Sequence, residues 1–503
     1  MNTPHSVIRL FGYSVIAALG GCTSLPSVGP SYEEPKFEVP EYLLPDAGQP
    51  TSNLTATCEY RPAESNEDNR VVISKDVVEQ WWKRFDDKIL AALVEAGVEH
   101  NKGYLMAQKR LEQSQYELLG SYAAFLPKFT AGGLWNRDWK NVSAGGAHNG
   151  YAYNTQNVAL DGNWEIDIFG GNRRATEAAF AMAEAAGWTL SDAWVSLTTQ
   201  IGAQYVNLRT TQACLDVAHT NLVLQSETYD ILKSRLDSGI GDELAVNQCA
   251  YIVEETRARI PALLAEEEAI KNQLAILAGK IPGTLHKLLN PVADRREWLL
   301  EPQKVAELKL DMMRARPDVK AAERRLAAQT ASIGIAKAQW FPKLFVTGTV
   351  GWQSNDRTRI FDRDSFFAAL GPSVSWPIFQ GGAIYANVKA TEAKTEEAAL
   401  AYEEALQKAY QEVRDAYSAY TQEYHRYQSL KAAVKAATDA VTISKDLYKN
   451  GLRDFNNVLD AQRSRLSYEE QFVRSRGQIT INLIALYKSL GGGLAYDRPD
   501  EQE

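Results

Sequence analysis

Two stretches of the chain alternate apolar and polar residues with a period of two, which is typical of strands. In the first, one face carries Val158, Leu160, Trp164, Ile166 and Ile168, and the other carries Asn157, Asp161, Asn163, Glu165 and Asp167. In the second, the faces are Leu344, Val346, Val350 and Trp352 against Phe345, Thr347 and Thr349. With their flanking residues, these stretches predict two β-hairpins, at about 127–168 and 342–379, and therefore four strands.

After each hairpin the pattern changes to that of a very long helix. No proline occurs from Gly171 to Gly239 or from Gly382 to Gly451. Each run of about 68 residues would extend roughly 100 Å as a helix. In the second run, apolar and tyrosine residues recur with a period near 3.5, which keeps one seam against a neighbouring helix. We interpret this seam as helix packing rather than as an aromatic box for a ligand.

The chain carries an internal duplication. A helical stretch enters a strand through a Pro-Lys pair at Pro127 and again at Pro342, 215 residues later. Gly239 and Gly451, 212 residues apart, follow the two long helices and predict turns into returning helices. Landmarks at nearly one offset indicate a repeat. Because proline removes a helical hydrogen bond and glycine relieves tight turns, we expect joints between helices and strands at these positions. The expected joints are Pro127, Pro342, Gly170, Gly171, Gly381 and Gly382.

The N-terminus has the pattern of an export signal. Arg9 precedes an apolar core from Leu10 to Leu19, and the following Gly-Gly-Cys ends at Cys22 and resembles a bacterial lipobox. We expect Cys22 to be lipidated, and cleavage nearby by an ordinary signal peptidase is the alternative. The predicted organisation is a signal peptide (1–21), a lipidated Pro-rich leader (22–80), a first structural repeat (81–300), a second structural repeat (301–490) and a flexible C-terminal tail (491–503).

Composition excludes several functions. A net charge of −9, from 54 basic and 63 acidic residues, argues against a nucleic-acid partner. Past the N-terminus, no apolar run approaches the roughly 20 residues of a membrane-spanning helix. The six histidines are scattered, and neither a phosphate-binding loop nor a nucleophile motif is present. We therefore expect no enzyme activity, no cofactor and no metal site.

Three cysteines remain beyond the lipobox: Cys58, Cys214 and Cys249. An odd number leaves at least one thiol unpaired, which argues against a disulfide scaffold. On antiparallel helices joined near residue 240, Cys214 and Cys249 would be separated by roughly 25 Å along the axis. We expect them not to pair, because that separation is far beyond the reach of a disulfide.

The strand count restricts what the two hairpins can form. Alternating strands fit a soluble sandwich as well as a membrane sheet, but four strands cannot close a membrane barrel, which needs about eight. An open edge is not tolerated in lipid. A membrane role therefore requires several chains to pool their strands, and three chains would supply twelve. Candidate residues for the interfacial aromatic belts are Trp135, Trp139, Trp164, Trp352 and Trp376.

The chain resembles the outer-membrane efflux factors of the TolC superfamily, and more closely their NodT-like lipoprotein branch. The resemblance rests on the lipobox at Cys22 with its Pro-rich leader, on WWKRFDDKILAALV (81–94), and on WEIDIFGGNRRATEAA. RARPDVKAAERRLAAQTASIGIAKAQWFPKL (314–344), SWPIFQGG and GLRDFNNVLDAQRS complete it. It implies a mainly α protein with a small β part. In a homotrimer, a long α-helical barrel of coiled-coil-like helices would continue into a transmembrane β-barrel with four strands per protomer.

The resemblance also implies a function. The chain would be the outer-membrane exit duct of a tripartite efflux system that exports drugs or toxic compounds, lipid-anchored and extending into the periplasm. Its partners would be outer-membrane lipid, a periplasmic membrane-fusion adaptor and an inner-membrane pump of the RND type, with Gly239 and Gly451 at adaptor-facing tips. The alternative is the outer-membrane arm of a type I-like protein secretion apparatus. A coiled-coil structural lipoprotein would not need two alternating hairpins.

In the family, the tips near the second distal turn nearly close the tunnel at its periplasmic end. Matching positions here give a periplasmic gate of Tyr448, Arg453, Asp460 and, more weakly, Arg463. The chain departs from the family pattern at Asn457 and Ala245, where acidic residues are expected, so the gate would depend on fewer charge pairs. The alternative is a merely solvated helical tip.

Overall fold

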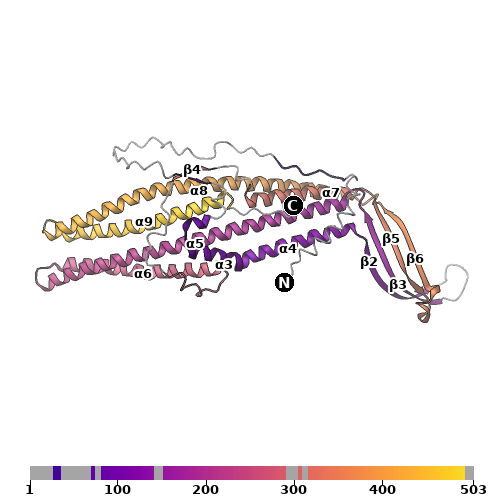
Figure 1. Ribbon diagram of the computed structural model, residues 1–503, viewed down its shortest axis with the longest axis horizontal. Coiled ribbons are helices and arrows are strands. Elements are labelled where there is room, and N and C mark those ends of the chain that lie inside the picture. Colours follow the sequence, from indigo (N-terminus) through magenta and orange to yellow (C-terminus); the bar gives the residue numbers. More distant parts are fainter. Residues whose placement is uncertain are drawn as a thin grey trace. The chain divides into compact units, whose positions relative to one another are not determined.

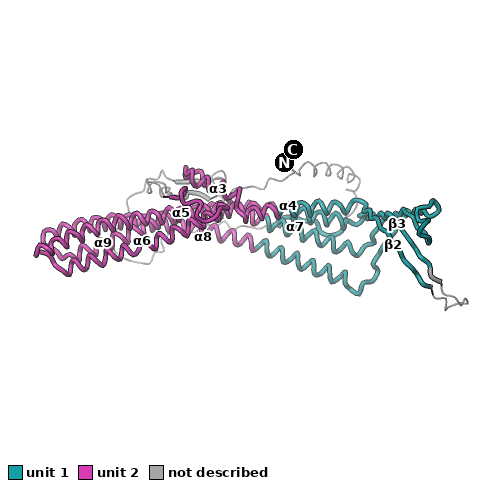
Figure 2. Tube along the Cα trace, turned by 90° about the horizontal axis from the view of Figure 1, so that it is seen from below, with its two compact units in different colours: residues 1–36, 110–186, 321–403 teal, residues 37–109, 187–320, 404–503 magenta. Residues whose placement is uncertain are grey.

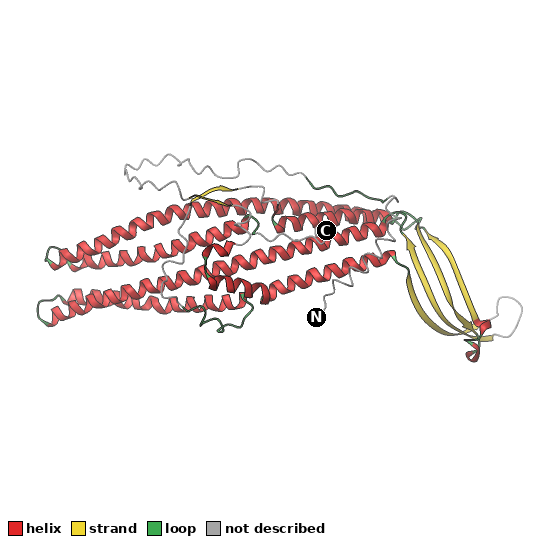
Figure 3. Ribbon diagram, in the orientation of Figure 1, coloured by secondary structure: helices red, strands yellow, loops and turns green. Residues whose placement is uncertain are grey.

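Helices make up most of the protein, and its strands gather mainly in one sheet (Figures 1 and 3). The computed structural model describes residues 27–35, 70–73, 81–140, 151–290, 304–308 and 315–492. The predicted signal peptide, Cys22, Cys58 and most of the predicted C-terminal tail lie outside the described residues. The elements are β1 (Arg70–Ile73), η1 (Trp81–Phe85), α3 (Lys88–His100), α4 (Lys102–Tyr122), η2 (Ala123–Phe125), β2 (Lys128–Lys140), β3 (Tyr151–Ile166), α5 (Gly171–Asp237), α6 (Glu243–Leu277), β4 (Lys304–Leu308), α7 (Pro317–Ala338), β5 (Lys343–Ser354), η4 (Arg357–Arg359), η5 (Arg363–Ser365), β6 (Phe366–Ser375), α8 (Ala383–Lys449) and α9 (Phe455–Ser489).

The chain divides into two compact units (Figure 2). The first comprises residues 1–36, 110–186 and 321–403, and the second comprises residues 37–109, 187–320 and 404–503. Each unit takes residues from both halves of the sequence, so the units in space differ from the repeats along the chain. Helices α5 and α8 each begin in the first unit and end in the second.

Both long helices are present. Helices α5 and α8 have 67 residues each, and the returning helices α6 and α9 have 35 each. The backbone φ is +76° at Gly239 and +69° at Gly451, a conformation that glycine adopts without strain. The side chain of Asp242 then caps α6 by accepting a hydrogen bond of 3.0 Å from the Leu244 amide. The second unit thus contains two helical hairpins, α5–α6 and α8–α9. Among the described residues, no helix is both long and apolar enough to cross a membrane.

The four strands of the predicted hairpins form one antiparallel sheet in the first unit, in the order β2-β3-β5-β6. The register places Gly133 opposite Val158 and Val158 opposite Trp352. The mainly α fold with a small four-stranded sheet is therefore confirmed.

A second, smaller sheet was not expected from the sequence. Strand β1 comes from the leader and pairs in parallel with β4, which follows the first helical hairpin. The segments have only four and five residues, Arg-Val-Val-Ile and Lys-Val-Ala-Glu-Leu. The expectation that the chain has only four strands was wrong for this reason, because runs this short carry too little alternation to be detected.

Tight packing of η1 and α3 on α5 forms part of the core of the second unit. Trp81 is fully buried, and a Cβ on Gly202 would lie 2.1 Å from its ring. Asp87 accepts hydrogen bonds from the Ile89 and Leu90 amides at the start of α3, and Tyr205 of α5 donates its hydroxyl to the same carboxylate. The WWKRFDD stretch therefore fastens α3 to the middle of α5.

Arg316, in the RARPDV stretch, holds three helices together at the start of α7. Its guanidinium, 6% exposed, donates to the Ser489 carbonyl at the end of α9 (2.9 Å) and to Asp318 (2.8 Å) and Glu412 (2.6 Å). A single arginine thus joins the start of α7 to α8 and α9 within the second unit.

We predict that Gly202→Ala lowers the thermal stability of the protein, whereas Gly120→Ala does not. A methyl group at Gly202 overlaps the Trp81 ring, and such overpacking costs about 1–3 kcal/mol. A methyl group at Gly120, within α4, meets nothing within 4 Å and improves helix propensity by up to about 1 kcal/mol. Thermal unfolding followed by circular dichroism compares the two variants. Equal midpoints would contradict the close packing of Trp81.

Candidate functional site

The four-stranded sheet has two chemically different faces. One face, here called the apolar face, carries mostly large apolar side chains. Three of them are strongly exposed: Phe129 (68%), Leu370 (82%) and Val374 (68%). Apolar side chains at this exposure are unusual for a surface in water and suit a lipid environment.

The opposite face of the sheet, here called the polar face, carries hydrogen-bonded polar side chains. Thr349 donates to Asp161 (2.7 Å), and Lys343 pairs with Glu165 (2.9 Å), in each case across the β3–β5 register. This register confirms the predicted alternation for residues 157–166 and 344–352. The alternation was predicted to continue to Ile168, but β3 ends at Ile166. Such a sheet separates an apolar from an aqueous environment.

The joints between helices and strands repeat one device. The indole of Trp164 donates to the Phe125 carbonyl (2.9 Å), and the indole of Trp376 donates to the Trp340 carbonyl (3.0 Å). Each carbonyl lies two residues before the proline of its joint, where the helix ends. The tryptophan at the end of each hairpin therefore satisfies one of the last carbonyls before the strand, which has no helical partner because the helix ends there.

The glycine joints lie where the strands return to helices. Gly170 and Gly381 have positive φ values of +83° and +58°, and Gly382 has +86°. Gly171 is the first residue of α5, and Asp167 accepts a hydrogen bond of 2.9 Å from the Arg173 amide there. Pro127 and Pro342 lie directly before β2 and β5.

Residues 27–35 of the leader form an extended strap on the first unit. The Val28 amide donates to the Phe169 carbonyl (3.1 Å), and Arg174 donates to the carbonyls of Val28 (3.3 Å) and Gly29 (3.2 Å). The Tyr32 hydroxyl donates to Glu323 (3.0 Å) on α7. Buried Arg174 thus holds this part of the leader through two of its carbonyls.

The predicted gate residues lie in and after the α8–α9 turn, but they are not all brought together. Tyr448 stacks edge-on against Phe455 (5.1 Å between ring centroids) and lies beneath Arg235 of the other hairpin (5.7 Å). Arg453 and Asp460 are exposed, and neither has an ion pair within the described part of the chain.

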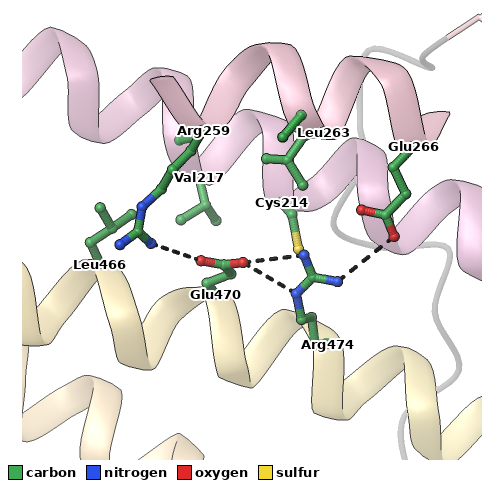
Figure 4. Close-up of a pocket in the computed structure, with 10 residues that line it drawn as sticks. Cys214, Val217, Arg259, Leu263, Glu266, Leu466, Glu470 and Arg474 are labelled. Atoms are coloured by element: carbon green, nitrogen blue, oxygen red, sulfur yellow. Dashed lines mark hydrogen bonds and ion pairs between the residues drawn. The ribbon is translucent and has the colours of Figure 1, made fainter. Parts of the chain in front are cut away.

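Arg463 and its neighbours form a ladder of ion pairs between α6 and α9. The pairs are Glu255–Arg463 (3.6 Å), Arg259–Glu470 (3.3 Å) and Glu266–Arg474 (4.0 Å), and Figure 4 shows the last two. Beside them lies a cavity of about 330 Å³ whose apolar lining includes Val217, Leu263 and Leu466. The ladder ties the return helix of one hairpin to that of the other, and Arg463 is the predicted gate residue that takes part.

Cys214 lines the same cavity, and Cys249 lies closer to the tip. The two thiols do not pair with each other, as predicted, and both are buried. The Cys249 sulfur lies 3.8 Å from the carbonyl of Gln225, which is eleven residues from Cys214 along α5, or about 16 Å. Burial raises the pKa of Cys214 to about 12 and that of Cys249 to about 11. Among the described residues, no group of three potential ligands could hold a metal ion.

Comparison with known proteins identifies this arrangement. The family model described as outer membrane efflux protein matches residues 93–280 and 311–492, which is most of the chain. The chain belongs to the outer membrane efflux protein family. The predicted family and the predicted role, an outer-membrane channel in efflux, are thereby confirmed.

Relatives of this efflux protein align with most of its length. Outer membrane protein OprJ of Pseudomonas aeruginosa is 28% identical over 424 residues, covering 82% of this chain and 86% of OprJ. Nodulation protein T of Rhizobium leguminosarum bv. trifolii is 27% identical over 446 residues, covering 89% of each. The structure of the outer-membrane channel OprN has a TM-score of 0.76 at 28% identity, covering 93% of this chain and 99% of that one.

Two features of this efflux protein were not recognised in the sequence. Trp164 and Trp376 were assigned to aromatic belts, and their hydrogen bonds at the joints were missed. Their matching positions at the ends of the two hairpins were the available signal. The strap had no signal, because its contacts with Arg174 and Glu323 join residues about 145 and 291 positions apart.

We predict that Cys214 and Cys249 resist alkylation by iodoacetamide at pH 8 in the folded protein and react after unfolding. Folding favours the protonated thiols, so their contribution to stability is present below the ordinary pKa of 9.0 and is lost as the pH rises toward 11–12. Mass spectrometry under non-reducing conditions counts the modified thiols. A linked Cys214–Cys249 pair, or rapid labelling of the folded protein, would contradict the structure.

Proposed function

We propose that three copies of this chain assemble into an exit duct through which a tripartite pump exports small toxic compounds. The observation that carries the proposal is the open four-stranded sheet with one exposed apolar face. Its outer strands, β2 and β6, each have a neighbouring strand on one side only among the described residues. Because unpaired backbone groups are not tolerated in lipid, these edges need strands from other copies.

Pooling strands from three copies gives twelve, enough to close a barrel with a polar lumen. The apolar face would then meet lipid, and the polar face with Asp161 and Glu165 would line the water-filled interior. The two repeats, residues 81–300 and 301–490, would contribute one hairpin each from every copy. Closure of a barrel by three copies thus explains both the alternation of apolar and polar side chains and the open edges of the sheet.

The turns at Gly239 and Gly451 are the proposed adaptor-facing tips. Each tip exposes large apolar side chains: Ile240 is 71% exposed, Leu244 59% and Leu452 68%. Exposed apolar residues at a helical turn suit docking against another protein. We propose that a periplasmic membrane-fusion adaptor covers them and connects the duct to an RND-type pump in the inner membrane.

We propose that Cys22 is lipidated and anchors the chain in the outer membrane. Ser27 of the strap packs against Gly170, at the joint between sheet and helix. The five-residue span from Cys22 can extend about 18 Å at most. The acyl chains would therefore enter the bilayer close to the base of the sheet.

We propose that Tyr448, Arg453, Asp460 and Arg463 form the periplasmic gate. The exposed charges of Arg453 and Asp460, which lack ion pairs among the described residues, are available to neighbouring copies. Exposed pairs contribute about 0.2–1 kcal/mol each, so threefold repetition would give about 1–3 kcal/mol. This range is comparable to the free-energy difference of about 3 kcal/mol that keeps closed and open channels at a ratio of about 99:1.

Planar-bilayer recording of the purified protein tests the duct, and susceptibility profiling of a deletion strain tests the export. We expect single channels from the assembled protein and increased sensitivity of the strain to toxic small molecules. Absence of channels would overturn the duct. Unchanged susceptibility together with a loss of exported protein would favour the secretion apparatus instead.

We predict that Asp460→Ala and Arg453→Ser raise the fraction of open channels in bilayers without an adaptor. Each substitution removes three charges from the assembled trimer. When the closed and open states differ by a few kcal/mol, this loss is enough to change the ratio of open to closed channels several-fold. The control is Arg257→Ser, which removes an exposed arginine whose one ion pair among the described residues is with Glu254 of its own helix. If both gate variants assemble and keep the wild-type closed-state current, Arg453 and Asp460 do not form the gate.

We predict that the mature chain begins at Cys22 and carries acyl chains. Stable anchoring of a protein to a membrane takes two or more acyl chains. The measured mass should therefore exceed the mass of the polypeptide 22–503 by more than that of one acyl chain. Intact mass spectrometry of membrane-extracted protein measures it, with Cys22→Ser as the control. An unmodified N-terminus at another residue would contradict lipidation.

A further inference from the structure

The far end of the sheet, opposite the helix joints, carries arginines stacked on tryptophans. Strand β2 places Trp135, Arg137 and Trp139 on the apolar face, because alternate residues share a face and Gly133 pairs with Val158. The guanidinium of Arg137 lies 5.3 Å from the centre of the Trp139 ring. Arg357, from the β5–β6 connection, lies 5.2 Å from the centre of the Trp135 ring.

Aromatic side chains continue this cluster across the sheet. Trp352 packs edge-on against Phe361 (5.9 Å between centroids) and Phe366 (5.8 Å). Phe361 belongs to the same connection as Arg357 and is 69% exposed. The apolar face therefore ends in a belt of aromatic rings with guanidinium groups among them.

Three of the four carboxylates nearby have partners of their own. Asp356 accepts hydrogen bonds from the amide and hydroxyl of Thr358, and Asp362 pairs with Arg359 (3.0 Å). Asp138 alternates with its neighbours and so lies on the polar face, where it accepts from Asn136 (2.9 Å). Asp364, the remaining acid of the connection, is exposed without a hydrogen bond or ion pair among the described residues.

Three guanidinium groups at this end lack carboxylate partners within the described residues: those of Arg137, Arg357 and Arg363. All three are exposed. Guanidinium over an aromatic ring keeps its donors in a planar fork that matches phosphate oxygens in pairs. We call Arg137, Arg357 and Arg363 the arginine rim.

The rim lies at the height of lipid headgroups. Arg137 is eight residues beyond Phe129, or about 27 Å along the strand. With the tilt of about 40° usual in membrane sheets, this is about 20 Å of height, close to the thickness of the apolar band. This placement rests on the proposed function, which puts the helix joints on the periplasmic side and the far end on the outer side.

We propose that the arginine rim binds phosphate groups on lipid headgroups of the outer leaflet of the outer membrane. Tryptophan at the interface anchors the end of the sheet, Arg137 and Arg357 lie over its rings, and Arg363 adds a third guanidinium group from the β5–β6 connection. The ligand class is a phosphorylated lipid whose acyl chains lie along the apolar face. Such contacts fix the depth of the sheet in the bilayer.

The test measures binding of diphosphoryl lipid A to the purified full-length protein in neutral detergent. The same lipid without its phosphates and inorganic phosphate alone are the comparison ligands. We expect the phosphorylated lipid to bind most tightly, with each Arg→Gln change weakening it about fivefold and the triple variant about 100-fold. The triple Arg→Lys variant should bind with an affinity between those of wild type and the triple Arg→Gln variant, because the charge remains but the planar fork is lost.

Arg257→Gln, which removes an exposed arginine outside the sheet, is the matched control and should bind like wild type. Circular dichroism confirms that each variant is folded. Unchanged lipid binding by the folded triple Arg→Gln variant, equal binding of the lipid without phosphate, or displacement by an equal concentration of inorganic phosphate would overturn the proposal. Bilayer conductance of the same preparations separates the two hypotheses. Conducting channels without selective binding of the phosphorylated lipid would contradict lipid binding by the arginine rim. Selective lipid binding without conducting channels would contradict the proposed exit duct.

Discussion

Every backbone amide and carbonyl that enters lipid needs a hydrogen-bond partner, and the architecture of this protein follows from that requirement. Within the described residues, the larger sheet has four strands and therefore two edges. Closure with other copies satisfies these edges, and the duplicated hairpins supply strands in even numbers. The apolar and polar faces are then the chemical consequence of a sheet between lipid and water.

The same requirement applies where a helix ends and a strand begins. Pro127 and Pro342 end their helices and leave carbonyl groups without amide partners nearby. Trp164 and Trp376 answer this need with indole N–H groups from the other end of each hairpin. One side chain thereby closes each hairpin, satisfies the helix end and presents its ring at the base of the sheet.

Long-period features of this protein were predictable from sequence, and features that depend on distant contacts were not. The absence of proline from 171–239 and 382–451 predicts α5 and α8, and the period of two predicts which side chains share a face. The β1–β4 pair was missed because its segments are short. The partners of Arg174, Arg316 and Arg463 were missed because a single arginine does not indicate which distant element it will meet. Packing decides this, and Gly202 beneath Trp81 is an example that only coordinates reveal.

The strap has a consequence for the order of events during export. Its residues enter the periplasm first, yet they dock on Glu323 of α7, 291 positions after Tyr32, and against Gly334. The docking surface is therefore completed only after two thirds of the chain has been translocated. If Cys22 is lipidated as proposed, processing and acylation would take place while the strap still lacks its docking surface. Contacts of such long sequence separation form slowly, so this delay would give the proposed processing time to finish before the strap docks.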